Sequence, residues 1–169
     1  ESEVEQEGRA IVQELLDMGI AEIGQGGVPV VKIDEKLGLE AETYRTRLLQ
    51  LVDEDTRAYE RIMQALQLPK HTPEETTARK AALHEATKGA ILVPLETLRV
   101  CVASMEVAHA MGRIGMPSSI SDAGVGVLCA RTGALAAYLN VRTNFKGFDD
   151  AAFQQAVMTE AEALRARAE

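Results

Sequence analysis

The feature that most constrains the fold is a run of apolar residues that recur at steps of three and four, the spacing of one face of an α-helix. The members of this stripe are Leu48, Leu51, Val52, Tyr59, Ile62, Met63 and Leu66. Asp55 falls near its middle, whereas Asp53 lies about 200° around the helix, on the polar side. A carboxylate that faces a core must be paired, hydrogen-bonded or protonated. The pattern therefore predicts that Asp55 is either a buried structural acid or part of a functional site.

Composition favours a single all-α domain over residues 1–169. Apolar residues make up 46% of the chain, with only three Phe, three Tyr and no Trp. Helical cores rely on Leu and Ala, whereas sheets are enriched in aromatic and β-branched residues. We expect an antiparallel, up-and-down bundle of about five helices.

Turn and cap signals divide the first half of the chain. An amphipathic helix is predicted over 3–23, and a glycine-rich linker over 24–29 ends it. A short extended segment at 28–33 precedes a long helix that begins at Asp34 or Leu39 and ends at Leu68, before a proline.

The second half contains three more predicted helices. Thr72 and Glu75 form a capping box around Pro73, which suits the first helical turn. Pro94 is expected to kink or restart the helix that follows. Ser121 caps a helix over 122–143, whose small residues predict a close approach by another helix or a ligand. Asp149 or Asp150 caps the last helix.

Charge and cysteine usage narrow the class of function. The net charge is −8 and no basic run occurs, so nucleic acid is not an expected partner. No apolar run approaches the length of a membrane span, and no signal-peptide pattern is present, which predicts a cytoplasmic protein without membrane contact. Cys101 and Cys129 are expected to be buried free thiols. The three histidines lack metal-ligand spacing, so no metal site is predicted.

Several motifs, in this order and spacing, resemble the cyclodeaminase/cyclohydrolase family. These are Leu51-Val52-Asp53-Glu54-Asp55-Thr56-Arg57-Ala58-Tyr59, Ala65-Leu66-Gln67-Leu68-Pro69-Lys70, Val93-Pro94-Leu95, Ser121-Asp122-Ala123-Gly124-Val125 and Asn140-Val141-Arg142-Thr143-Asn144. The family includes the C-terminal domain of formiminotransferase-cyclodeaminase and stand-alone methenyltetrahydrofolate cyclohydrolases. Residues 1–30 depart from its pattern, because the family's glycine-preceded, alanine-rich first helix is not recognisable here.

The resemblance implies a folate one-carbon substrate, no bound cofactor and a homodimer. The leading expectation is hydrolysis of 5,10-methenyltetrahydrofolate to 10-formyltetrahydrofolate, with Asp55 as the acid/base. The first alternative is a formiminotetrahydrofolate cyclodeaminase, which releases ammonia. The alternative of another class is a non-catalytic folate-binding or oligomerisation module.

The resemblance also implies substrate-binding roles for five further residues: Lys70, Asp122, Asn140, Arg142 and Asn144. Each has a structural explanation as well. Lys70 could be an ordinary exposed lysine, Asp122 a residue of a helix start, and Arg142 an ion-pair partner. Asn140 and Asn144 lie one turn apart and could fix helix ends instead of binding a pterin.

Overall fold

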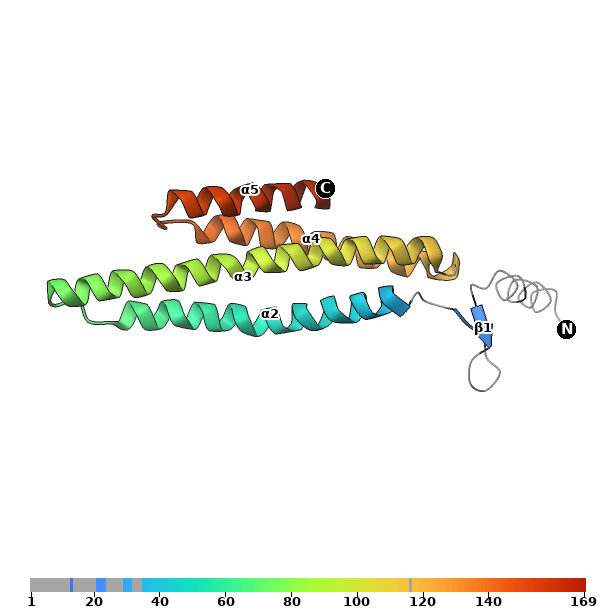
Figure 1. Ribbon diagram of the computed structural model, residues 1–169, viewed down its shortest axis with the longest axis horizontal. Helices are drawn as coiled ribbons and strands as arrows, with labels where there is room; N and C mark the ends of the chain where they lie inside the picture. The colour runs from blue at the N-terminus through green and yellow to red at the C-terminus, as the bar shows by residue number, and fades with distance from the viewer. Residues whose placement is uncertain (1–12, 14–20, 24–28, 32–34, 116) are drawn as a thin grey trace.

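The computed structural model describes residues 13, 21–23, 29–31, 35–115 and 117–169 (Figure 1). Within this part, four helices account for most of the chain: α2 (Glu35–Gln67), α3 (Pro73–Ile114), α4 (Ile120–Asn144) and α5 (Ala151–Ala168). A short 3-10 turn, η1 (Pro117–Ser119), joins α3 to α4. The predicted all-α architecture is therefore confirmed. The described residues form four long α-helices, whereas the sequence predicted about five.

Two short strands precede the helices. Strand β1 (Ala21–Ile23) pairs antiparallel with β2 (Pro29–Val31), with Ala21 opposite Val31. The predicted extended segment thus matches β2. The predicted helix over 3–23 was wrong at its end, because the backbone at Ala21–Ile23 pairs with β2; most of that helix lies outside the described residues.

Helix α3 is the centre of the bundle, with α2 along one side and α4 along the other (Figure 1). Helix α5 packs on both α3 and α4. Successive helices run in opposite directions, which confirms the up-and-down arrangement.

Helix ends follow the local chemistry of the sequence in most places. The Thr72 side chain accepts from the Glu75 backbone N–H, and Glu75 accepts from the Thr72 N–H in return, so the capping box is present. Asp150 accepts from the Phe153 N–H. The predicted start at Ser121 was wrong by two residues, since Ser119 is the N-cap of α4 and makes no side-chain cap bond. Pro94 does not restart α3, which continues to Ile114.

The main core lies where α3, α4 and α5 meet. Leu98 and Ile91 of α3, Val141 of α4 and Ala161 of α5 have no exposed side-chain surface. The three phenylalanines contact one another at the α4–α5 turn, where Phe148 belongs to this core and Phe145 and Phe153 pack against it. That turn places Gly147 at a φ of +81°, where a side chain would be strained.

The small residues of α4 serve packing within the chain. A Cβ at Gly133 would lie 3.0 Å from Cys101 Sγ, and one at Gly126 would lie 3.7 Å from the Ala108 Cβ. Glycine therefore permits the close approach of α3 and α4 that the sequence predicted.

Length and composition alone would allow the segment Pro117–Asn144 to cross a membrane, although the sequence suggested that no apolar run was long enough. Its most apolar 18-residue window is 22% buried inside the chain. Helix α4 packs against α3 and carries Arg131, whose Nε donates to the Ala168 carbonyl. Helix α4 thus packs one face inside the chain.

The two cysteines differ in environment. Cys101 is buried, and burial raises the pKa of its thiol. Cys129 is exposed on α4, so the prediction that both thiols are buried was wrong for this residue. Its helix has an apolar outer face as well as an apolar inner one, and the spacing alone did not distinguish them.

Candidate active site

Asp55 lies on an apolar face of α2 that α3 leaves uncovered. Leu51, Ala58 and Ala65 recur every seven residues and form the buried seam of this helix. The parallel row one residue later is exposed: Val52 by 64%, Tyr59 by 63% and Leu66 by 42%.

Asp55 projects between the buried and the exposed row and is itself exposed. The prediction that it faces a core was therefore wrong for a single chain. The apolar stripe is real, but it is wider than the surface that α3 covers.

Contacts between α2 and α3 give the position of Asp55 along the bundle. The Arg47 Nε lies 3.8 Å from a Glu96 carboxylate oxygen, and Arg79 donates to the Leu66 carbonyl at 2.9 Å. Because the two helices are antiparallel, the level of Asp55 is found by counting forward on α2 and backward on α3. Counted from the first contact, Asp55 is eight residues after Arg47, and the residue eight before Glu96 is Lys88. Counted from the second contact, Asp55 is eleven residues before Leu66, and the residue eleven after Arg79 is Ala90. Asp55 thus stands opposite residues 88–90 of α3.

Contacts between α3 and α4 bring Asn144 to the same level. The Asn144 Nδ2 donates to the Ala90 carbonyl at 2.8 Å, and the Gly133–Cys101 and Gly126–Ala108 contacts follow the same antiparallel register. Asp55 and Asn144 therefore flank one stretch of α3 from its two sides. Asn140 lies one turn before Asn144 on the same side of α4 and is exposed.

This level of the bundle has a carboxylate on one side of α3 and two amides on the other. Asn144 is half-buried, and its amide oxygen has no partner among the residues that the structure describes. In the same part of the chain, no three His, Cys, Asp or Glu side chains could hold a metal ion. A carboxylate can take and return a proton, and amides can bind the polar edge of a heterocycle.

Of the other three predicted residues, two lie away from this level, and Arg142 lies at this level but on another side of α4. Lys70 is exposed in the α2–α3 turn. It follows the last residue of α2, Gln67, which is itself about 18 Å along the helix from Asp55. Asp122 is exposed in the first turn of α4, about 33 Å along the axis from Asn144. The Arg142 guanidinium lies 5.8 Å from the centre of the Tyr138 ring, about 200° around α4 from Asn144. A single chain does not bring these three to Asp55.

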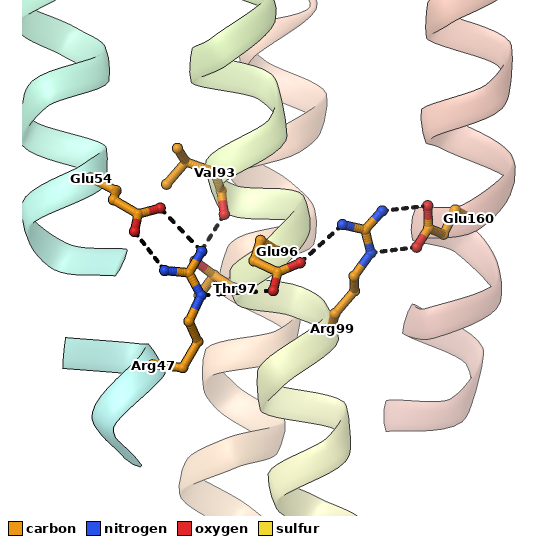
Figure 2. Close-up of polar contacts among 7 residues, drawn as sticks. All are labelled: Arg47, Glu54, Val93, Glu96, Thr97, Arg99 and Glu160. Atoms are coloured by element: carbon orange, nitrogen blue, oxygen red, sulfur yellow. Dashed lines mark hydrogen bonds and ion pairs between the residues drawn. The ribbon is translucent and has the colours of Figure 1, made fainter. Parts of the chain in front are cut away.

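The sequence did not predict a network of ion pairs that begins next to Asp55, at Glu54. Arg47 binds both carboxylate oxygens of Glu54, at 2.5 and 3.1 Å, and also approaches Glu96 (Figure 2). Arg99 of α3 binds Glu96 at 3.0 Å and reaches α5 through Glu160 at 2.5 and 2.7 Å.

These contacts lower the pKa of both Glu54 and Glu160, because each carboxylate accepts hydrogen bonds from an arginine. The network of ion pairs links α2, α3 and α5. The seven-residue spacing of Arg47 and Glu54 is a signal that sequence reasoning could have used; the Arg99–Glu160 pair, 61 residues apart, leaves none.

A hollow between α2 and α3 lies on the side of α2 that faces away from Asp55. Its volume is about 400 Å³, and its lining includes Arg61, Gln64, Glu85 and Gly89. Arg61 and Gln64 lie more than about 100° around the helix from Asp55. The Asp55 site is thus an open surface in a single chain and not an enclosed pocket.

Fold and site together define an all-α antiparallel domain with an acid and paired amides on its surface. Residues 31–163 match the family model described as formiminotransferase-cyclodeaminase, and the chain belongs to this family. A methenyltetrahydrofolate cyclohydrolase of Methylorubrum extorquens is 42% identical over 147 residues, which are 86% of this chain and 71% of that protein.

Vertebrate relatives match over a shorter stretch. The formimidoyltransferase-cyclodeaminase of Mus musculus is 35% identical over 109 residues, or 64% of this chain, and that of Gallus gallus is 36% identical over 108 residues, or 63%. The matched part spans 20% of each of these relatives. These matches bear out the family resemblance that the motifs indicated.

Proposed function

We propose that this protein hydrolyses 5,10-methenyltetrahydrofolate to 10-formyltetrahydrofolate. What supports the proposal is the family match, together with Asp55, an exposed carboxylate beside the exposed apolar row of α2. The bacterial relative that matches over most of both chains bears the name of this activity. Folate is substrate and product here, with no bound cofactor and no metal.

The reaction needs one group that accepts a proton and gives it back. Water adds to the bridging carbon of the cationic amidinium, and Asp55 takes the proton that the water loses. The same proton then passes to N5 as the bond between N5 and the bridging carbon breaks. The remaining hydroxyl proton of the adduct leaves to solvent as the carbonyl forms, so that the products are the formyl group on N10 and one released proton. An anionic Asp55 also stabilises the positive charge of the bound substrate.

The proposed binding roles are those that the family resemblance implies. Asn140 and Asn144 would hydrogen-bond the pterin through their amides. Lys70, at the end of α2, would meet the glutamate carboxylates of an extended folate. Arg142 would hold a carboxylate from the far side of α4, and Asp122 would contact the polar part of the substrate.

Homodimerisation belongs to the proposal, and the exposed apolar rows support it. A single chain exposes Val52 and Tyr59 beside Asp55, and a second copy could exclude water from that face. A cytoplasmic location is proposed on the sequence pattern alone.

The second candidate is a formiminotetrahydrofolate cyclodeaminase, in which N10 attacks a formimino carbon and ammonia leaves. The names of the vertebrate relatives favour it. It needs the same acid/base, so substrate choice and not geometry separates the two. A non-catalytic folate-binding or oligomerisation module is the third candidate, favoured by the open surface around Asp55.

The test is loss of the methenyltetrahydrofolate chromophore with purified protein, with chromatography of the 10-formyl product. Parallel reactions with formiminotetrahydrofolate measure released ammonia. Hydrolysis above the buffer rate supports the proposal. Ammonia release without hydrolysis would move the assignment to the deaminase, and folate binding without either reaction would move it to the module.

A further inference from the structure

One face of α2 is apolar and exposed, and it holds a single charged residue. Between residues 52 and 66, the side chains that lie within about 80° of one another around this face are Val52, Asp55, Tyr59, Met63 and Leu66. Together they form the Asp55 face, and all of them are exposed in the single chain. Contiguous apolar surface of this kind marks a site of interaction.

The Tyr59 ring has no structural use within the described chain. Tyr138, by contrast, is 5% exposed, and the guanidinium groups of Arg142 and Arg165 lie 5.8 and 5.2 Å from the centre of its ring. Tyr59 is 63% exposed, and its side chain has no ring or hydrogen-bond partner among the residues that the structure describes. Packing of the chain therefore does not explain an aromatic ring at this position.

The charge of Asp55 is not neutralised by a neighbouring side chain. In the described part of the chain, no Lys, Arg or His forms an ion pair with it. Lys88 stands at its level on α3, but the Lys88 ammonium lies 4.9 Å from the centre of the Phe153 ring on α5. The carboxylate of Asp55 is therefore available to a cationic ligand.

The Tyr59 ring and the Asp55 carboxylate are placed to contact one ligand. They are four residues apart on a helix, which separates their Cβ atoms by about 5–6 Å. Aromatic side chains on helices point back toward the N-terminus, so the Tyr59 ring covers the turn that carries Asp55. An anion beside the face of an aromatic ring attracts a flat, delocalised cation, through charge on one side and a cation–π contact on the other.

Charge complementarity favours such a ligand over a second copy of the chain packed directly on this face. Two copies paired here would bury each Asp55 against apolar side chains or against the other Asp55, and an unpaired buried carboxylate is strongly unfavourable. A cationic aromatic ligand neutralises the carboxylate and also covers the apolar residues around it.

We propose that the Asp55 face selects the cationic form of the folate substrate and that Tyr59 is a specificity-determining residue. The inference rests on the proposed function. The planar amidinium of 5,10-methenyltetrahydrofolate lies against the Tyr59 ring beside Asp55. The aminobenzoyl ring extends over Met63, whose sulfur favours aromatic contacts, toward Lys70. Hydrolysis removes the positive charge, so the product loses both interactions and binds less tightly than the substrate.

Steady-state kinetics of three variants test this role. Tyr59→Leu keeps an apolar side chain but removes the ring, so KM for 5,10-methenyltetrahydrofolate should rise about 2- to 30-fold while kcat changes little. Tyr59→Phe keeps the ring and should retain most of the affinity. Leu39→Ala is the matched control, because Leu39 is 65% exposed on the opposite side of α2, about 24 Å along it from Asp55.

A neutral competitor separates recognition of the charge from recognition of the shape. 5-Formyltetrahydrofolate lacks the cationic bridge, so Tyr59→Leu should raise its inhibition constant by a smaller factor than it raises KM. Equal factors would reject selection of the cation. An unchanged KM in Tyr59→Leu, or an increase that Tyr59→Phe or Leu39→Ala reproduces, would also overturn the proposal.

Two further measurements separate this proposal from its alternatives. Sedimentation velocity follows association of each variant, and a Tyr59→Leu protein that loses association but keeps its KM would assign the face to a second copy and overturn the proposal. If the wild type hydrolyses no folate, equilibrium dialysis with 5,10-methenyltetrahydrofolate decides. Weaker binding by Tyr59→Leu than by the wild type would then reject the proposed function but support the binding face. Equal binding, or none, would reject both.

Discussion

Replacing Leu128 by alanine separates a role in association from a role in folding. Leu128 is 60% exposed in the single chain. Full burial of a leucine side chain contributes about 1.5–3 kcal/mol, so covering its exposed part contributes about 1–2 kcal/mol. A two-fold pair contains the change twice, and association should weaken by about 2–4 kcal/mol, or about 30- to 1000-fold in Kd.

The assay is sedimentation equilibrium over a wide range of protein concentration, with helix content followed by circular dichroism. We expect Leu128→Ala to raise the dissociation constant while the monomer keeps its helix content. Leu92→Ala is the matched control, since Leu92 is 41% exposed on α3, whereas Leu128 is on the outer face of α4. A dissociation constant unchanged by Leu128→Ala, or raised equally by Leu92→Ala, would refute the reasoning.

Three further changes test the fold. Thr72→Ala removes the N-cap bond to Glu75 and should lower the free energy of unfolding by about 1 kcal/mol in urea titrations, whereas no loss would contradict the capping role. Gly133→Leu should lower the free energy of unfolding by about 1–3 kcal/mol, because its Cβ would meet Cys101. Gly124→Ala is the control and should be neutral or stabilising, because open space surrounds Gly124. Equal losses in the two variants would contradict the close approach of α3 and α4. Arg99 lowers the pKa of Glu160 in the folded chain, so this pair stabilises the fold above the ordinary glutamate pKa of about 4.5, and that contribution is lost as pH falls through the lowered value. Thermal unfolding of Glu160→Gln should thus depend less on pH below about 4.5 than that of the wild type, and identical profiles would count against the pair.

The helices were predictable because local signals and the global fold agree along most of the chain. The capping box at Thr72, the cap at Asp150 and the small residues of α4 each predicted the contact that the structure shows. Strand β1 was missed because three residues of strand inside an apolar pattern look the same as a helix end.

The apolar stripe of α2 was predictable, but the exposure of Asp55 within it was not. Periodicity identified Asp55 as a carboxylate in an apolar row, and it cannot tell whether a row faces the chain's own core or a neighbour. Cys129 on α4 was misplaced for the same reason. The distance between Asp122 and Asn144 follows from helix length, but only the register of α4 against α3 shows which of them stands level with Asp55.

The Arg99–Glu160 contact shows what no local pattern contains. Its partners are 61 residues apart, and their meeting depends on how α5 packs against α3. Long-range ion pairs of this kind follow from the tertiary structure alone.

The most direct measurement compares hydrolysis by Asp55→Asn with hydrolysis by Asp53→Asn, as kcat/KM for 5,10-methenyltetrahydrofolate. The two substitutions make the same chemical change two residues apart on one helix, and both aspartates are exposed. A general acid/base contributes about 100- to 10,000-fold, so Asp55→Asn should lose that much activity while Asp53→Asn stays close to the wild type. Equal activity of the two variants, in folded protein, would contradict the assignment of Asp55.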